Sequence, residues 1–338
     1  MATIKDVAKA AGVSVTTVSI VINDKAKERS IPEMTQERIH RAMHELGYQP
    51  NLTARRLRSK YKQVPMVVFF WPLDFRVTIL ASFLNAFSGE IKRSGFDCEL
   101  VVRTYESGSL DRHDEAMLKS GYNGLIVGAC TQQDIEHLET LKPQMPVILI
   151  NRESDIFSTV SVDNDAVGKL AAEQFSRKGY QNVAVFASNR EYLATSLRVQ
   201  AFIRSCEALG IHVNEEYVIR DASTVEGGYR IAKHYCNMKD KPKAVFCDSD
   251  VIAFGALKAF YDKGVRVSDE VEMITIDMTI SGTTAYSTPS LSVIEMPNEE
   301  VGKSVIRLLR DKISSNSLDP THIKISPSLI LRESFLEA

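Results

Sequence analysis

Polar and charged residues directly follow several short apolar runs in the second part of this 338-residue chain. Such runs are typical of buried strands, and ligands of parallel α/β sheets bind where the strands end. These residues offer guanidinium, amide, hydroxyl and carboxylate groups beside an aromatic ring, which suits a small polar ligand held by bidentate hydrogen bonds. They are Asp74, Phe75 and Arg76, then Asn151 and Arg152, then Ser188 and Asn189, then Asp248, Ser249 and Asp250, and finally Asp277. An acid after a strand is also often only the N-cap of the next helix, an alternative that weighs more for Asp250 than for Asp277.

The motifs of common enzyme classes are missing from the sequence. No GxGxxG follows an apolar run, and GxxxxGK[ST], GxSxG and HExxH do not occur. The seven histidines are scattered without the spacing of metal ligands. We therefore expect neither an enzyme nor a metal or cofactor.

Strands and helices alternate in the part of the chain that would position the polar residues. Two series of apolar runs are predicted as strands: Met66–Trp71, Cys98–Val102, Gly124–Ala129 and Val147–Ile150, then Val183–Ala187, Tyr217–Ile219, Ala244–Cys247 and Met273–Ile276. Amphipathic segments between them are predicted as helices: Ile79–Arg93, Ala166–Lys178, Leu197–Leu209, Glu226–Met238 and Val251–Lys263. This alternation predicts parallel sheets covered on both faces, arranged as two Rossmann-like lobes.

The first 50 residues follow a helical pattern instead. Apolar residues at helical spacing predict one helix that Thr3 caps and Gly12 ends, and a second helix, about Val15–Ile22, that Ser14 caps. A third helix, about Thr35–Leu46, places Leu46 among its inward residues. The pattern favours a helix-turn-helix over another small helical bundle. The outward face of the second helix carries no acid, as a helix entering a phosphate-lined groove requires: Val15, Thr16, Thr17, Ser19 and Ile20.

The charge of the chain is unevenly divided. Residues 1–62 hold 12 Lys and Arg against 6 Asp and Glu, a net charge of +6, whereas the rest carries −8. A basic module on an acidic body indicates a polyanion partner for that module, although charge alone would also fit a solvated basic run. No apolar run approaches the ~20 residues of a membrane span. The absence of a signal segment, with five widely spaced cysteines and no CxxC, indicates a reduced, cytoplasmic protein.

Several motifs together resemble the lactose-repressor/galactose-repressor (LacI/GalR) family. Residues 3–23 resemble its T-I-x-D-V-A-x-x-A-G-V-S-x-x-T-V-S headpiece, and residues 45–51 its E-L-G-Y-x-P-N junction. Further matches are Pro146–Arg152, Ser161–Asn164, Leu197–Phe202, Asp250–Leu257 and Leu329–Ser334. The resemblance covers essentially the full length. Two departures near the N-terminus are a longer loop at Asp24–Pro32 and Ile20, where many members place a base-reading Arg.

The resemblance implies a DNA-binding headpiece and a hinge. Residues 51–62 contain no acid and would form a helix that folds on DNA, with Leu57 as a wedge in the minor groove. The implied DNA-binding residues are Thr3, Ser14, Val15, Thr16, Thr17, Ser19, Ile20, Asn23, Asn51, Ala54, Arg55, Leu57 and Arg58. On composition alone the same segment would fit a plain solvated linker.

The resemblance also implies ligand contacts, most of which fall on the strand-end residues of this sequence. They match Phe75, Arg76, Asn151, Arg198, Ser249 and Asp277, and often Arg152 and Asp250. Around this site the sequence departs from the family pattern at Trp71–Leu80 and Thr275–Met278, which leaves the ligand's identity open.

The expected architecture is a small all-α helix-turn-helix headpiece on an α/β two-lobed body of the periplasmic-binding-protein type, with two Rossmann-like parallel sheets. The boundaries are 1–50 for the headpiece, 51–62 for the hinge and 63–338 for the body. The N-terminal lobe takes about 63–160 plus 294–322, and the C-terminal lobe about 161–293 plus 323–338.

We expect the protein to be a sequence-specific transcriptional regulator that acts as a repressor. It would bind a near-palindromic double-stranded DNA operator as a homodimer. A dimer and not a tetramer is expected, because the sequence has no heptad tail of the kind with which members of the family form tetramers. A small polar effector, a sugar or related metabolite, would bind between the lobes, without a membrane partner. The alternatives are a periplasmic-type solute-binding protein without a DNA role and, third, an α/β enzyme.

Overall fold

The computed structural model describes residues 3–22, 26, 29–46, 64–74, 76–119, 121–188, 193–278 and 282–336. Contacts between residues divide the chain into two compact units, Met1–Val64 and Pro65–Ala338. The first unit holds the headpiece and the second unit is the body.

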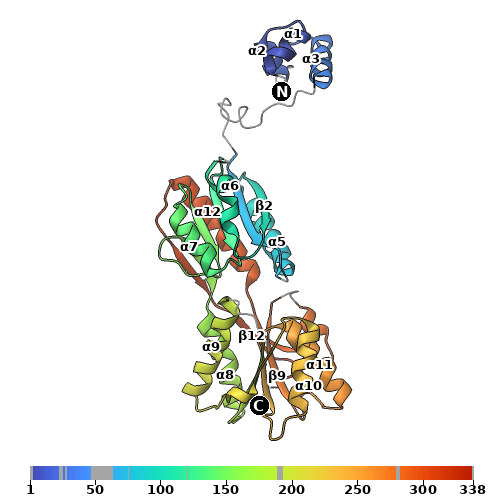
Figure 1. The fold of residues 1–338 in the computed structure, drawn as a ribbon, viewed down its shortest axis with the longest axis vertical. Helices are drawn as coiled ribbons and strands as arrows, with labels where there is room; N and C mark the ends of the chain where they lie inside the picture. The colour runs from blue at the N-terminus through green and yellow to red at the C-terminus, as the bar shows by residue number, and fades with distance from the viewer. Residues whose placement is uncertain are drawn as a thin grey trace. The chain divides into compact units, whose positions relative to one another are not determined.

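Three helices form the described part of the headpiece: α1 (Ile4–Ala10), α2 (Val15–Ile22) and α3 (Glu33–Glu45) (Figure 1). Thr3 and Asp6 form a capping box at the start of α1, in which the backbone N–H of Thr3 donates to the Asp6 carboxylate at 2.8 Å. Ser14 Oγ accepts from the N–H of Thr17 at 3.0 Å. Between the helices, Gly12 has a φ of +61°, which L side chains rarely adopt. The predicted helix-turn-helix is confirmed.

The headpiece has a small core to which each helix contributes. Its buried members include Val7 from α1, Val18 and Val21 from α2, and Ile39 from α3. Leu46 was predicted to face inward, and this is wrong: it is 40% exposed, because α3 ends one residue before it.

The N-terminal lobe of the body is built on a parallel sheet that, among the described residues, has the order β11-β5-β4-β3-β1-β2. Its strands are β1 (Met66–Pro72), β2 (Glu99–Tyr105), β3 (Gly124–Gly128), β4 (Val147–Ile150), β5 (Ser158–Val162) and β11 (His322–Ile325). The helices over its two faces are α5 (Val77–Ser94) with α12 (Asn298–Ser315), and α6 (Asp114–Lys119) with α7 (Gln132–Leu141).

Alternate residues of β1 explain why that strand is apolar throughout. Val67 and Phe69 belong to the cluster that contains residues of α5 and α12, whereas Val68 and Phe70 belong to the cluster that contains residues of α6 and α7. Both faces of the strand are therefore buried, which is the reason that its sequence shows no polar alternation.

The C-terminal lobe repeats this plan with the order β12-β10-β9-β8-β6-β7 among the described residues. Its strands are β6 (Val183–Ser188), β7 (Val218–Asp221), β8 (Ala244–Cys247), β9 (Glu272–Asp277), β10 (Ser292–Glu295) and β12 (Ser328–Ile330). The helices are α8 (Asn164–Arg177), α9 (Leu193–Ala208), α10 (Val225–Cys236) and α11 (Asp250–Lys263). Short 3-10 turns lie at Leu110–His113, Glu215–Tyr217 and Thr283–Tyr286.

Within the described residues the chain crosses between the lobes three times, after β5, after β10 and between β11 and β12. The N–H of Asp163 in the first crossing donates to the carbonyl of Ile325 in the third at 2.9 Å. One detail differs from the predicted all-parallel sheets, since β12 is antiparallel to β10. The reason is that β12 starts at the junction of the lobes, where β10 ends.

A buried carboxylate joins α5 to α12 in the N-terminal lobe. Glu90 is 1% exposed and accepts hydrogen bonds from Arg93 at 2.6 Å and from Arg307 Nε at 3.1 Å. Burial alone would raise the pKa of Glu90, but the hydrogen bonds and charges of the two arginines outweigh it, so the pKa lies below its usual value of 4.5.

Glu90→Gln should lower the free energy of unfolding of the body at pH 7 by about 1–2 kcal/mol, because Arg93 and Arg307 would then bond to an uncharged amide oxygen instead of a carboxylate. Because the pKa of Glu90 is lower in the folded than in the unfolded protein, its ionised carboxylate stabilises the fold at pH values above the unfolded pKa, near 4.5. This stabilisation is lost as the pH falls through the pKa of the folded state. Urea unfolding should therefore show a difference between wild type and variant that shrinks below pH 4.5. Glu299→Gln, which alters an exposed Glu of α12, is the control. An equal effect of both variants would contradict this assignment.

Candidate functional site

The outward surface of α2 is uncharged and rich in hydroxyl groups. Ser14, Val15 and Thr16 are exposed, whereas Thr17, Ser19 and Ile20 are half-buried. Thr3, at the start of α1, is exposed as well. The surface can therefore approach phosphates without repulsion and present short side chains to base edges.

Ile20 lies outside the headpiece core. The buried core residues and the partly buried residues that pack against them include Ile22 of the same helix but not Ile20. This favours a role at the surface of α2 over a role in packing.

Several of the predicted residues lie outside the described parts of the chain: Asn23, Asn51, Ala54, Arg55, Leu57, Arg58, Phe75 and Asn189. Their roles stay predictions from the sequence.

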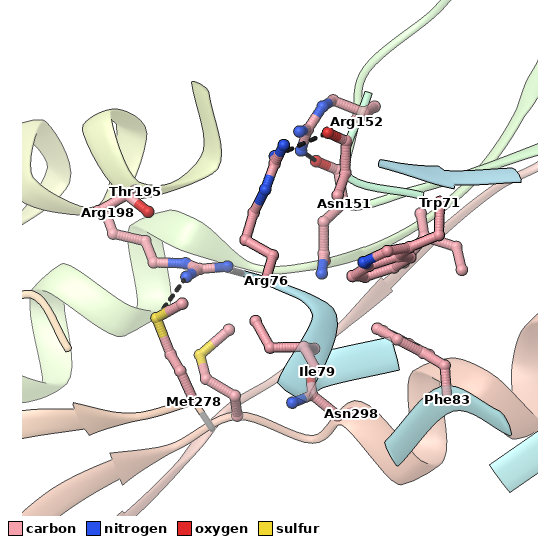
Figure 2. Close-up of a pocket in the computed structure, with 13 residues that line it drawn as sticks. Trp71, Arg76, Ile79, Phe83, Asn151, Arg152, Thr195, Arg198, Met278 and Asn298 are labelled. Carbon is pink, nitrogen blue, oxygen red and sulfur yellow. Dashed lines mark hydrogen bonds between the residues drawn. The ribbon is translucent and has the colours of Figure 1, made fainter. Parts of the chain in front are cut away.

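A pocket lies in the body, where the carboxyl ends of the strands of both lobes meet (Figure 2). Its described lining consists of Trp71, Arg76, Ile79, Phe83, Ala129, Ile150, Asn151, Arg152, Thr195, Arg198, Met278, Met296 and Asn298. The accessible volume is about 60 Å³.

Arg76 is held in place by a carboxylate. Its Nε donates to both oxygens of Asp74, at 2.9 and 3.1 Å, and one terminal nitrogen also pairs with that carboxylate. The other terminal nitrogen donates to the carbonyl of Ala129 at 2.7 Å. The guanidinium of Arg76 is thus neutralised and fixed at the wall of the pocket.

Arg152 and Arg198 are buried without such a partner. Arg152 is 5% exposed and donates to the carbonyls of Cys130, at 2.5 Å, and Asn151, at 2.6 Å. Arg198 is 4% exposed and donates to Asn164 Oδ1 at 3.1 Å, with Met278 Sδ at 3.5 Å. Neither forms an ion pair with a carboxylate among the described residues.

The pKa values of these two arginines reflect that environment. Burial, and then the positive charge of Arg152, lower the pKa of Arg198 to about 10. Burial lowers the pKa of Arg152 as well. Both groups stay protonated at neutral pH, so their desolvation is a cost to the folded protein.

Asn151 is oriented by the backbone around it. It follows β4 with a φ of +53°, a conformation that Asn tolerates better than most residues. Its Oδ1 accepts from the N–H of Val162 at 2.9 Å. The oxygen is thereby assigned to the β5 side, and the NH₂ group is left to face the pocket as a donor.

Trp71, the only tryptophan of the chain, brings a second donor. It is 3% exposed, and its ring packs against Phe69 and Phe83. Gly128 leaves room for the ring, because a Cβ there would lie 2.5 Å from it. The indole Nε1–H has no hydrogen-bond partner among the described residues. In Figure 2 this nitrogen and the amide nitrogen of Asn151 face the same space.

The candidate acids and serine of the C-terminal lobe lie beside the pocket but not in its described lining. Ser249 takes the N-cap position of α11, and Asp250, the first residue of that helix, accepts from the N–H of Met278 at 3.3 Å. Asp277 accepts from Thr284 Oγ1 at 3.1 Å, and its other oxygen has no hydrogen-bond partner among the described residues. Burial and the charge of Asp250 raise the pKa of Asp277.

The structure therefore brings Arg76, Asn151, Arg152 and Arg198 together. The strand-end pattern missed the apolar wall and Trp71, since it counted Trp71 only as the last apolar residue of a strand. The signal available was a lone tryptophan at the end of the predicted strand, three residues before Asp74 and five residues before Arg76.

Among the described residues there is no cluster of three or more potential metal ligands, and none of the described helices is long and apolar enough to cross a membrane.

Comparisons with known proteins agree with both units. Residues 3–51 match the family described as bacterial regulatory proteins, lacI family, and residues 172–335 match the periplasmic binding protein-like domain. The HTH-type transcriptional repressor PurR of Pasteurella multocida is 29% identical over 342 residues, which cover 99% of this chain and 98% of that protein.

Two solved structures are similar as well. A LacI family transcription regulator from Clostridium acetobutylicum is 28% identical with a TM-score of 0.76, and the match covers 79% of this chain and 99% of that one. The Lac repressor dimer bound to operator and the anti-inducer ONPF has a TM-score of 0.75 at 21% identity, covers 99% of both chains, and supports the fold.

A helix-turn-helix unit joined to a two-lobed, periplasmic-binding-protein-like body defines a ligand-responsive DNA-binding regulator. The N-terminal unit carries the DNA-binding region of the lacI family of bacterial regulatory proteins, and nearly the whole chain is similar to HTH-type transcriptional repressors.

Ile20→Arg should change base preference at one operator position. Ile20 is apolar and outside the core, so it suits the methyl group of thymine, whereas Arg reads guanine by a bidentate contact. We expect a shift from T·A toward G·C of about 1–3 kcal/mol at that position, measured by selection of bound DNA from a random pool. Unfolding of the headpiece, or an equal loss of affinity for all sequences, would instead make Ile20 a core or backbone-facing residue.

Two substitutions distinguish the paired arginine of the pocket from an unpaired one. Asp74→Asn removes the counter-ion of Arg76 and should lower the free energy of unfolding of the body by about 1–3 kcal/mol. Arg198→Met removes a desolvated charge, so stability should stay unchanged or rise by up to about 2 kcal/mol. Urea denaturation followed by circular dichroism measures both. If Arg198→Met destabilises as much as Asp74→Asn, Arg198 has a counter-ion after all.

Proposed function

We propose that this chain is a transcriptional repressor that binds a near-palindromic operator as a homodimer and responds to a small effector in the pocket of the body. The observation that carries the proposal is the pocket itself: side chains from both lobes line it, and one buried donor among them, the indole N–H of Trp71, has no hydrogen-bond partner among the described residues. A ligand that contacts side chains of both lobes would hold the two lobes in one relative arrangement.

In the proposed mechanism the ligand acts by its differential affinity for two arrangements of the lobes. Arg152 and Asn151 belong to the N-terminal lobe, whereas Arg198 and Met278 belong to the C-terminal lobe. A ligand that bridges them favours one arrangement, and residues 51–62 would transmit the change to the headpiece. Such coupling is typically about 1–3 kcal/mol, and it is reciprocal, so operator DNA changes ligand affinity by the same factor.

The headpiece supports the DNA-binding part of the proposal. The α2 helix contains neither acid nor base, and its exposed residues are small or hydroxyl-bearing. The dominant positive charge would come from residues 51–62, which hold five Lys and Arg and no acid. Phosphate contacts from this segment would supply affinity and position the protein on the DNA, whereas base contacts from α2 would supply sequence specificity.

The decisive experiment is selection of bound DNA from a random pool by the full chain, repeated with candidate metabolites. The expected result is a palindromic consensus whose binding weakens with salt and changes in affinity with one class of metabolite. A chain that binds metabolites but enriches no DNA sequence would be a solute-binding protein and would contradict the proposal.

Leu57→Ala should weaken binding to the selected operator by about 1–3 kcal/mol and reduce DNA bending, because an apolar wedge unstacks a base step. Electrophoretic mobility of circularly permuted DNA fragments reports the bend, and effector binding should not change. Leu46→Ala, which alters a Leu exposed beyond the end of α3, is the matched control. Unchanged affinity and bending would show that Leu57 is not the wedge.

A further inference from the structure

The described polar residues that line the pocket are donors of hydrogen bonds far more than acceptors. They are Trp71, Arg76, Asn151, Arg152, Thr195, Arg198 and Asn298, and no Asp or Glu is among the described lining residues. Asn151 presents its NH₂ group because its oxygen is already engaged by Val162. The indole N–H of Trp71 is buried and has no partner among the described residues. A neutral sugar, whose hydroxyl groups both donate and accept, would find few acceptors here.

Positive charge in the pocket exceeds what nearby carboxylates neutralise. Of the three arginines in the described lining, Arg76 has Asp74 as its ion-pair partner. Among the described residues, Arg152 and Arg198 bind only backbone carbonyls, an amide oxygen and a thioether sulfur. Proteins rarely bury an arginine without a counter-ion, because the desolvation is costly.

The neighbouring acids of the C-terminal lobe form no ion pair with Arg198 among the described residues. Asp248 attracts Arg198 only through space: one oxygen of its carboxylate accepts from the N–H of Ser188 at 2.7 Å, and the other has no hydrogen-bond partner among the described residues. Asp250 accepts from the N–H groups of Val251 and Met278. Neither carboxylate forms an ion pair with Arg198 within the described chain, so the guanidinium remains available to a ligand.

We propose that the effector carries an acidic group, a carboxylate or a phosphate, and that this group binds to Arg152 and Arg198. The inference rests on the proposed function of the pocket as the effector site and specifies the class of effector. Arg76, already neutralised, positions the wall of the pocket, and the N–H groups of Trp71 and Asn151 supply further donors to the anion or to an adjacent oxygen (Figure 2).

The rest of the lining indicates an organic acid rather than an inorganic ion. Ile79, Phe83 and Met296 form an apolar wall beside the ring of Trp71. A carbon skeleton can pack against this wall while the acidic group faces the arginines. Because Arg152 and Arg198 come from different lobes, one anionic group that binds both would also bridge the lobes.

The test uses compounds in matched pairs that differ in charge. The full chain is titrated with glucose, gluconate and glucose 6-phosphate, and with a wider set of metabolites paired as acid against amide or as phosphate ester against alcohol. Fluorescence of Trp71, the only tryptophan, reports occupation of the pocket, and thermal stabilisation gives an independent measure by mass action. We expect the anionic member of a binding pair to bind at least ten-fold more tightly, and the carboxylate and phosphate arms identify which anion is preferred.

Variants link that preference to the two arginines. Arg198→Met and Arg152→Met should each weaken binding of the anionic member at least ten-fold and that of its neutral partner less than three-fold. Arg204→Met is the matched control on α9, because that arginine is exposed and paired with Asp165. Arg198→Lys keeps the charge and should retain part of the affinity, and it remains informative if Arg198→Met does not fold.

The possible outcomes separate this inference from the proposed function. Neutral compounds that bind as tightly as their acids, a set in which no acid binds, or affinities that ignore Arg198→Met and Arg198→Lys would overturn the inference. If a neutral binder still alters operator affinity, the proposed function stands without it. If an acid binds through the arginines and operator affinity does not respond, the acid site stands and the proposed function fails.

Discussion

The passage of the chain between the two lobes of the body, three times within the described residues, is the constraint on which the rest of the structure depends. Because the crossings lie where strands of both sheets end or begin, the polar residues after β1 and β4 meet those of α9 and β9 at one junction. The hydrogen bond between Asp163 and Ile325 ties two of the crossing segments together. Any change in the relative orientation of the lobes must therefore take place about these segments, and a pocket between the lobes is a place where a ligand can select one orientation.

The arginines of the pocket show how binding and folding compete in this body. Arg76 contributes to folding, because Asp74 neutralises it and Ala129 fixes it. Arg152 and Arg198 remain charged in a buried environment whose hydrogen-bond acceptors are neutral, which is a cost to the folded protein. Sites that keep such unmet charge are commonly functional, since structure elsewhere in the molecule must offset the cost.

Much of the fold follows from local sequence patterns, and most of what the sequence could not give depends on tertiary context. Continuous apolar runs such as that of β1 identify central strands, because both faces are buried. The strands β11 and β12 are short and half-exposed, so they carry no such signal, and the direction of β12 depends on where the third crossing leaves the chain. At the pocket, residue types and strand ends placed Arg76 and Asn151 among the candidates. The lack of a counter-ion at Arg198 among the described residues depends on neighbours that only the folded chain brings together.

Strand β1 has a mechanical consequence for how the protein can signal. The chain enters the N-terminal lobe at Pro65, directly before Met66, and the same strand ends beside the pocket at Trp71 and Pro72. At about 3.3 Å for each residue, these seven residues span roughly 20 Å. Because β1 pairs with β2 on one side and with β3 on the other, it cannot slide or stretch independently of its sheet. A ligand that displaces Trp71 would therefore move β1 together with the strands paired to it, and the start of the strand at Met66 would move with them.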